Sequence, residues 1–416
     1  MGDGQLLVIR NSVFLFFYLI LLYLYLHAPV FNGNYTFRFL FLFILIYLLC
    51  NPSGIKYFLK TFSVEFRFVL FFIIYCIFRT LMGGDSSYVS MWVRTIFEFF
   101  LIPYVLLDLL SKRKLDSYKN FNSMLLLLGC MGAIITALCI INPSFNEIVK
   151  AHFSVIEDDN YLSVISYRCF GISDSLPFSY GIIQGIILLI GLIYMKENKW
   201  GIMFLPFIAV SILLNARTGF LIAVLGFFVY LVFAKPKLER LIPVITLVGI
   251  GIIVAGQFIT NYIDEKGLMW LTDFFNELDG IFLGNDNDTA TADMLLGDML
   301  ILPTTLGDWL IGKGYRLWRT NGDNSDVGYV LQLMYGGILY VFPLYLFIYK
   351  MYKRLRSSGY KVHAIIFLVI FSVSNIKGDF FPYNGAFRLL FFYYCFLIYV
   401  QKINCSYKNA SSYYSK

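Results

Sequence analysis

The sequence has few charged residues and few of the motifs that soluble enzymes use. Charged residues make up 14% of its 416 positions, whereas roughly a quarter is usual in a soluble domain. No Walker lysine–serine pair, HExxH or DxDxDG string occurs, so ATP use is not supported and the sequence holds neither of these metal-binding motifs. The seven cysteines form no CxxC pair, which argues against a thiolate metal site. We therefore predict no cofactor and no metal.

Long hydrophobic runs dominate what is present. Hydrophobic residues make up 59% of the chain, and the mean hydropathy is +0.72. Runs of roughly 17–25 residues recur along the chain, which is the length that crosses a bilayer as a helix. The sequence thus predicts an all-α polytopic membrane protein, one integral membrane domain over 1–416 with about 12 transmembrane helices. The predicted spans are 8–27, 36–50, 64–81, 90–110, 123–142, 177–195, 201–215, 218–234, 240–259, 327–349, 362–376 and 385–401.

The distribution of charge predicts the orientation in the membrane. The segments 1–10, 51–67, 111–122, 196–201, 235–240, 350–361 and 402–416 hold 21 of the 33 lysines and arginines but 5 of the 26 acids. Short basic loops face the cytoplasm. Both termini are then cytoplasmic, and the net charge of +7 is explained without nucleic acid as a partner. Two long loops face outward, over 143–176 and 260–326. The second is acidic, and apolar residues at helical spacing predict short helices within it.

The outward half carries an unusual set of cations. They are Arg38, Arg79, Arg94, Arg168, Arg217, Arg316, Arg319, Lys377 and Arg388. A guanidinium binds phosphate in a forked geometry and keeps its charge, so the set predicts a site for a lipid-linked phosphate or diphosphate. The alternative for Arg38, Arg79 and Arg94 is snorkelling or pairing, and Arg94 has Glu98 at helical spacing.

Two segments hold the sharpest candidates. Arg217 lies in LLNARTGFLIAV, where two spans meet with almost no loop, and the nearby glycine allows close backbone approach. The stretch 309–340 combines a GxG, Arg316 and Arg319, and a polar turn that leads into a span. Asp323 and Asp326 are candidates for a general base there. The alternative is that Asn324, Ser325 or Asp326 caps the next helix. Aromatic residues of this stretch, Tyr329 among them, are candidates to stack on sugar rings.

These residues carry a resemblance. ARTG at 216–219, together with LIGKGY and DVGYVLQLMYGGIL within 310–339, resembles the O-antigen polymerase (Wzy) and O-antigen ligase group. The likeness extends to the architecture: about 12 spans, cytoplasmic ends and a large late outer loop.

The resemblance implies a metal-independent glycosyltransferase of the GT-C type in the bacterial inner membrane. Such a polymerase moves the growing glycan from undecaprenyl diphosphate onto a new lipid-linked repeat unit, on the periplasmic side. Arg217, Arg316 and Arg319 match arginines expected to hold the diphosphate, and Asp326 and Tyr329 match the polar-then-aromatic start of the next span. By position, Arg168, Lys377 and Arg388 are expected to join them. The implied partners are a flippase, a chain-length co-polymerase and membrane lipid.

Three alternatives stay open at this point. A ligase would carry a histidine in the late outer loop, and 260–326 has none. A flippase of lipid-linked oligosaccharide would show two similar halves and no large outer loop. A scaffold without chemistry would leave the outward arginines unexplained.

Overall fold

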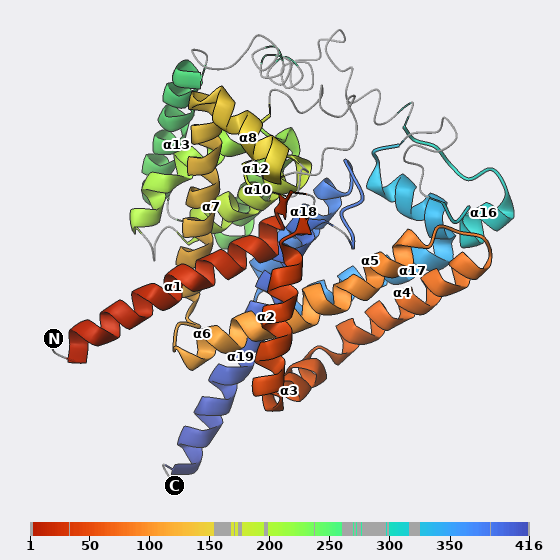
Figure 1. Ribbon diagram of the computed structural model, residues 1–416, viewed down its shortest axis with the longest axis horizontal. Coiled ribbons are helices and arrows are strands. Elements are labelled where there is room, and N and C mark those ends of the chain that lie inside the picture. Colours follow the sequence, from red (N-terminus) through yellow and green to blue (C-terminus); the bar gives the residue numbers. More distant parts are fainter. Residues whose placement is uncertain are drawn as a thin grey trace.

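The computed structural model describes residues 3–32, 34–153, 168–169, 171–173, 177–194, 199–236, 238–259, 299–315, 325–382 and 384–414, with isolated positions at 269, 272, 276 and 297. Within these residues the chain is helical, apart from two short strands that pair antiparallel. The predicted all-helical fold is confirmed at this level (Figure 1), and some of its helices are long and apolar enough to cross a membrane.

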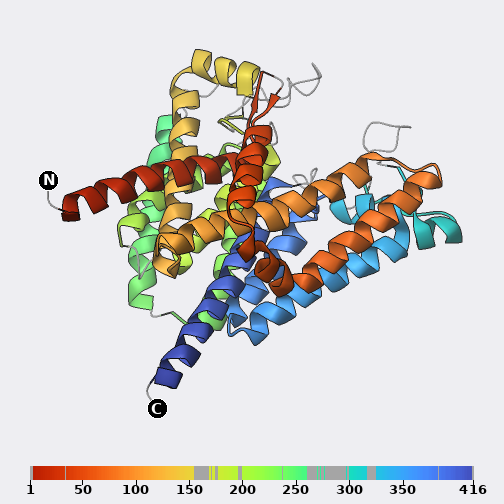
Figure 2. The same ribbon diagram turned by 60° about the horizontal axis from the view of Figure 1, so that its bottom comes forward.

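The first half of the chain contains the elements that later form the candidate site. They are α1 (Asp3–His27), β1 (Val30–Phe31), β2 (Asn34–Tyr35), α2 (Phe37–Cys50), α3 (Ser53–Thr61), α4 (Ser63–Leu81), α5 (Ser87–Thr95), the π-helix η1 (Ile96–Leu101), α6 (Ile102–Lys112), α7 (Tyr118–Ile141) and α8 (Pro143–Phe153). The helices α5, η1 and α6 follow one another without a loop, so they form one long rod in Figure 2.

The second half supplies the remaining helices. They are α10 (Pro177–Ile193), the 3₁₀ turn η2 (Lys199–Phe204), α11 (Leu205–Leu213), α12 (Arg217–Ala234), α13 (Leu238–Ile259), α16 (Leu306–Ile311), α17 (Gly328–Ser357), α18 (Lys361–Ser374) and α19 (Gly385–Tyr414). Each predicted span therefore falls on helix.

By their length and composition, fewer helices of the structure qualify as membrane crossings than the sequence predicts. Among the described residues, α7 and α17 are long and apolar enough to cross a bilayer. A third crossing is reached if α2 and Gly54–Thr61, which meet at 112°, form one broken span. Shorter apolar helices make up most of the rest. The count of about 12 spans remains a prediction.

Large apolar side chains on the outside support a lipid environment. Leu49 and Leu81 are each 82% exposed, and Ile74 on α4 and Phe342 on α17 are each 67% exposed. The interior is rich in aromatic rings instead, as in the stacked pair Phe72 and Trp92, whose centroids lie 4.2 Å apart. Since lipid replaces water around such a surface, exposed apolar groups carry no hydrophobic penalty there.

Small residues allow α10 and α12 to pack closely. A Cβ atom on Gly219 of the ARTG segment would lie 2.0 Å from the carbonyl oxygen of Gly181, and one on Gly185 would lie 2.3 Å from the carbonyl oxygen of Gly219. Backbone contact of this kind is how small residues join helices in membranes. The predicted close approach at Gly219 is confirmed.

A break in α17 explains the glycines of the second motif. Gly337 has φ +60° and ψ −166°, which interrupts the helix. The break frees backbone carbonyls, and the loop after α16 supplies their donors: Lys313 N donates to Met334 O at 2.7 Å, and Gly314 N donates to Tyr335 O at 3.0 Å. Tyr75 on α4 donates to Gly336 O at 2.6 Å. The GxG of residues 312–314 thus docks onto a helix break.

Arg79 completes this docking. Its side chain is 4% exposed, and its Nη2 donates to Gly312 O at 3.0 Å. Nearby, Asp85 N donates to Gly314 O at 2.7 Å. Arg79 therefore holds a backbone carbonyl of the loop, a structural role that differs from the snorkelling or acid pairing named as its alternative, whereas Arg38 is exposed on α2.

The break yields a stability prediction. Ala at position 337 must adopt a conformation that only glycine takes readily, at about 1–3 kcal/mol, and its Cβ would lie 2.5 Å from backbone atoms of Leu310 and Ile311. Gly359 also has a positive φ (+91°), but a Cβ there meets nothing within 4 Å. We expect Gly337→Ala to lower the apparent Tm of the detergent-purified protein clearly more than Gly359→Ala. An equal fall in Tm in both variants would show that the close contact between Gly337 and the docked loop does not add to stability.

Candidate functional site

A buried acid on the α5–η1–α6 rod is the centre of the site. Glu98 lies within η1, and its side chain is 2% exposed. One turn earlier, Arg94 is placed so that its Nε bonds to Glu98 Oε1, which confirms the predicted pair. A π-helical turn inside a longer helix is a local irregularity that is frequent at functional sites.

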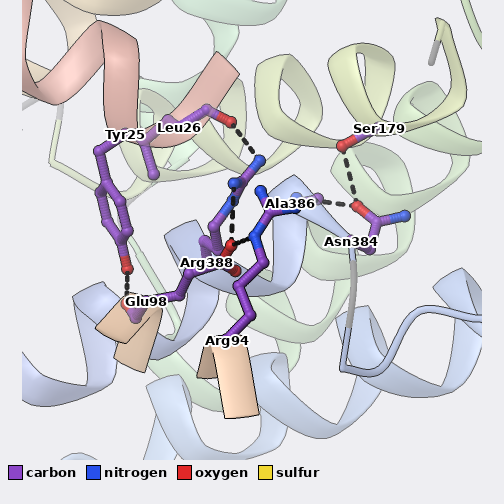
Figure 3. Close-up of polar contacts among 8 residues, drawn as sticks. All are labelled: Tyr25, Leu26, Arg94, Glu98, Ser179, Asn384, Ala386 and Arg388. Atoms are coloured by element: carbon purple, nitrogen blue, oxygen red, sulfur yellow. Dashed lines mark hydrogen bonds and ion pairs between the residues drawn. The ribbon is translucent and has the colours of Figure 1, made fainter. Parts of the chain in front are cut away.

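A second arginine reaches the same carboxylate from the far end of the chain. Arg388 lies in the first turn of α19 and is 1% exposed. Its Nη1 lies 3.6 Å from Glu98 Oε1, and its Nη2 donates to Leu26 O at 3.4 Å (Figure 3). We call Arg94, Glu98 and Arg388 the arginine cluster. It joins three parts of the chain: the end of α1, the rod and the start of α19.

The arginine cluster holds two positive groups and one negative group. Counted over these three residues alone, the net charge is +1. Arg388 also lies at the N-terminal end of α19, where the helix dipole adds positive potential. Buried charged groups are costly and are common at functional sites. The cluster therefore suits an anion that approaches from the side of Arg94, whose side chain is 30% exposed.

Neighbouring groups fix the geometry of the cluster. Tyr25 donates its hydroxyl to the backbone carbonyl of Glu98 at 2.6 Å. The ring of Phe37 lies under both guanidinium groups, at 4.9 Å from Arg94 Cζ and 5.6 Å from Arg388 Cζ. Such contacts stabilise a cation without neutralising it. They hold the two arginines in place and preserve their charge.

The start of α19 is held by Asn384. Its Oδ1 accepts from Ala386 N at 2.8 Å and from the hydroxyl of Ser179 on α10 at 2.9 Å (Figure 3). The first contact is a helix N-cap, and the second ties the cap to a neighbouring helix. The position of Arg388, within the first turn after this cap, is therefore set by two hydrogen bonds.

A polar network holds the loop that precedes α19. Gln332 on α17 donates from Nε2 to Asn375 Oδ1 at 3.1 Å and to Asp379 Oδ1 at 3.0 Å. Asn375 donates in turn to the hydroxyl of Tyr345 at 3.0 Å, and the hydroxyl of Tyr88 lies 3.4 Å from Asp379 Oδ2. Because Gln332 and Asn375 are fully buried, these bonds satisfy groups that would otherwise be costly. The network ties Asn375 and Asp379 of this loop to α5 and α17.

The structure places two other predicted residues beside this loop. Asp326 is half-buried, and its backbone carbonyl accepts from Gly378 N, so Asp326 lies next to the exposed Lys377. The predicted capping of α17 by Asn324, Ser325 or Asp326 is wrong, because its N-cap is Val327 and no side chain caps it. The hydroxyl of Ser325 instead accepts from Val327 N at 3.1 Å, in a turn just before the helix. Tyr329 on α17 donates its hydroxyl to Ser372 O on α18 at 2.9 Å, and this bond joins the two helices. Its ring also stacks on the ring of Tyr345, which lies on α17 as well.

The remaining predicted residues are placed only in part. Arg168 is half-buried, and the carbonyl of the next residue, Cys169, accepts from Thr136 and Asn215. Arg217 begins α12 as predicted, but its side chain is outside the described atoms. Arg316, Arg319 and Asp323 lie outside the described residues. Their roles stay predictions.

Sequence reasoning missed two features of this region. It considered Glu98 only as the partner of Arg94, because the contact with Arg388 joins residues 290 positions apart. It also left His27 without a role. His27 is 1% exposed beside Tyr23 and Tyr180, and neither ring nitrogen has a hydrogen-bond partner among the described residues. The sequence did contain a signal for each residue, because Glu98 is an acid within an apolar run and His27 is a histidine at the end of one.

Comparisons with protein-family models, with curated proteins and with solved structures give no match to this chain.

The shared carboxylate leads to a prediction. Glu98→Gln leaves Arg388 buried without its counter-charge, and loss of one partner of a buried ion pair costs about 3–5 kcal/mol. We expect a strong fall in the apparent Tm, and partial recovery in Glu98→Gln/Arg388→Met, which removes the stranded charge. Glu147→Gln, an exposed acid on α8, is the matched control and should leave the Tm unchanged. A Glu98→Gln protein as stable as this control would contradict the ion pair.

Proposed function

We propose that this chain is an O-antigen polymerase of the bacterial inner membrane, with about 12 spans, both termini in the cytoplasm and its site on the periplasmic side. It would transfer a growing glycan from undecaprenyl diphosphate to a new lipid-linked repeat unit, without a metal. The observation that carries the proposal is the arginine cluster, in which one buried carboxylate faces two arginines.

The charge of the cluster supports a diphosphate ligand. In this transfer the bond between the anomeric carbon and the phosphate oxygen breaks, and negative charge develops on the departing lipid diphosphate. Guanidinium groups that are already in place stabilise such charge without reorganisation. Arg388 and Arg94 would supply this stabilisation, with Arg217, Arg168, Arg316, Arg319 and Lys377 as further candidates for the same diphosphate or its glycan.

The acceptor half of the reaction needs a proton acceptor. A sugar hydroxyl of the incoming repeat unit forms the new bond to the anomeric carbon and loses its proton, which a carboxylate can accept. Asp326 and Asp323 are the candidates, and support for Asp326 comes from its place beside the loop that leads to Arg388. Tyr329 would then contact the glycan from the start of α17. A flippase and a chain-length co-polymerase are the proposed partners.

The two motifs that carry the resemblance divide into structural and chemical parts. Gly219, Gly312 and Gly337 have packing roles that any chain with this helix arrangement would need. Arg217 begins α12. In the proposed reaction this arginine is the chemical part of the motif, as a ligand of the diphosphate.

Arg217→Ala tests the proposal in cells. We expect loss of the lipopolysaccharide ladder, with core that bears one repeat unit, at an unchanged amount of protein in the membrane. The matched control is Arg38→Ala, an exposed arginine at the same predicted side, which should keep the ladder.

The gel also separates the alternatives. Deletion of the gene should leave core with one repeat unit if the chain is a polymerase. Bare core with polymer on the lipid carrier would identify a ligase, and bare core with lipid-linked units retained inside would identify a flippase. A normal ladder in Arg217→Ala would remove Arg217 from the site.

A further inference from the structure

A cavity with charged residues in its lining lies at the opposite end of α4 and α17 from the docked loop. It has a volume of about 360 Å³, roughly ten times the share of one water molecule in the liquid. The lining residues come from the end of α3, the start of α4 and the last turns of α17. They are Thr61, Val64, Glu65, Lys350, Lys353, Arg354 and Ser357.

The inner wall of this cavity is held together by hydrogen bonds to Glu65. Arg354 donates from Nη1 to Glu65 Oε1 at 2.7 Å and from Nη2 to Thr61 O at 2.7 Å, and its guanidinium lies over the ring of Phe62 at 5.1 Å. Tyr394 on α19 donates its hydroxyl to the same carboxylate oxygen. Glu65 is 2% exposed, so its charge is engaged within the wall. Arg354 is thereby held in the inner wall of the cavity.

The mouth of the cavity carries excess positive charge. Lys350 and Lys353 lie one turn apart on α17 and are exposed, and among the described residues no acid pairs with either. Three cations against one carboxylate leave the lining with a net charge of +2. Charge complementarity therefore favours an anion.

An apolar surface leads away from the same mouth. Exposed side chains on α4 include Val64, which lines the cavity, and Phe71 and Ile74 further along. On α17 the exposed side chains include Tyr349 and Phe342, which is 67% exposed. The two helices are in contact and run side by side in both views (Figures 1 and 2). A basic pocket at the end of an apolar strip matches a phospholipid, whose charged head and acyl chains are joined in the same way.

We propose that this cavity binds the phosphate of an anionic phospholipid from the leaflet that the basic loops face. Lys350 and Lys353 contact the phosphate, Arg354 forms the back of the pocket, and the acyl chains follow the exposed apolar side chains of α4 and α17. The basic segment 350–361 is predicted to be cytoplasmic, which assigns the lipid to the inner leaflet. This site is separate from the arginine cluster and does not rest on the proposed polymerase activity.

Native mass spectrometry of the detergent-purified full chain tests the site. The probe is phosphatidylglycerol, with phosphatidylcholine as the lipid of no net charge. The variant Lys350→Gln/Lys353→Gln removes both exposed cations of the pocket, and Arg356→Gln/Lys361→Gln removes two exposed cations from the same end of the molecule but outside the lining. Far-UV circular dichroism and the apparent Tm verify that both variants are folded.

The expected result is preferential retention of phosphatidylglycerol over phosphatidylcholine, with affinity reduced about tenfold or more in the pocket variant and little changed in the control. Equal losses in both variants would show general surface charge and overturn the proposal. Equal retention of both lipids would show that apolar contact alone holds them, with the same consequence. Displacement of the lipid by inorganic phosphate at millimolar concentration would assign the pocket to a free anion instead.

Discussion

The Glu98 carboxylate, shared by Arg94 and Arg388, is the interaction on which the rest of the site depends. It joins a π-helical turn in the α5–η1–α6 rod to the first turn of α19, while Tyr25 and Leu26 bring in the end of α1. The carboxylate contacts both guanidinium groups and so holds Arg94 and Arg388 in one place. The anion site that we propose rests on this same contact.

The loops around the cluster show how polar backbone is accommodated in an apolar protein. The break at Gly337 frees carbonyls of α17, and donors from residues 313–314 and from Tyr75 occupy them. In the loop before α19, Asn375 Oδ1 accepts from the backbone N of Phe380 at 3.3 Å, and Gln332 donates to the side chains of Asn375 and Asp379. Irregular backbone at membrane depth requires such internal partners, since lipid offers none. The glycines and polar residues that stand out in these segments of the sequence therefore have packing roles as well as candidate chemical roles.

The sequence predicts local features well and distant contacts poorly. Helices lie where apolar runs predict them, and the Arg94–Glu98 pair follows from four-residue spacing on one turn. The close approach at Gly219 was also predictable, because a glycine at a helix junction has few other uses. By contrast, the contact of Arg388 with Glu98 and the docking of residues 312–314 onto the break in α17 depend on tertiary packing. Neither contact can be predicted from the spacing of residues along the chain. The roles of Arg316, Arg319 and Asp323 stay predictions.

The most direct measurement of the central claim is binding of a lipid diphosphate to the purified protein. Farnesyl diphosphate and farnesol share the same prenyl chain and differ only in the diphosphate. A thermal-shift titration should show that farnesyl diphosphate raises the apparent Tm and that farnesol does not, with a smaller rise in Arg94→Gln, whose exposed guanidinium faces the approach to the cluster. An equal shift with both ligands, or a shift that Arg94→Gln leaves unchanged, would contradict the account.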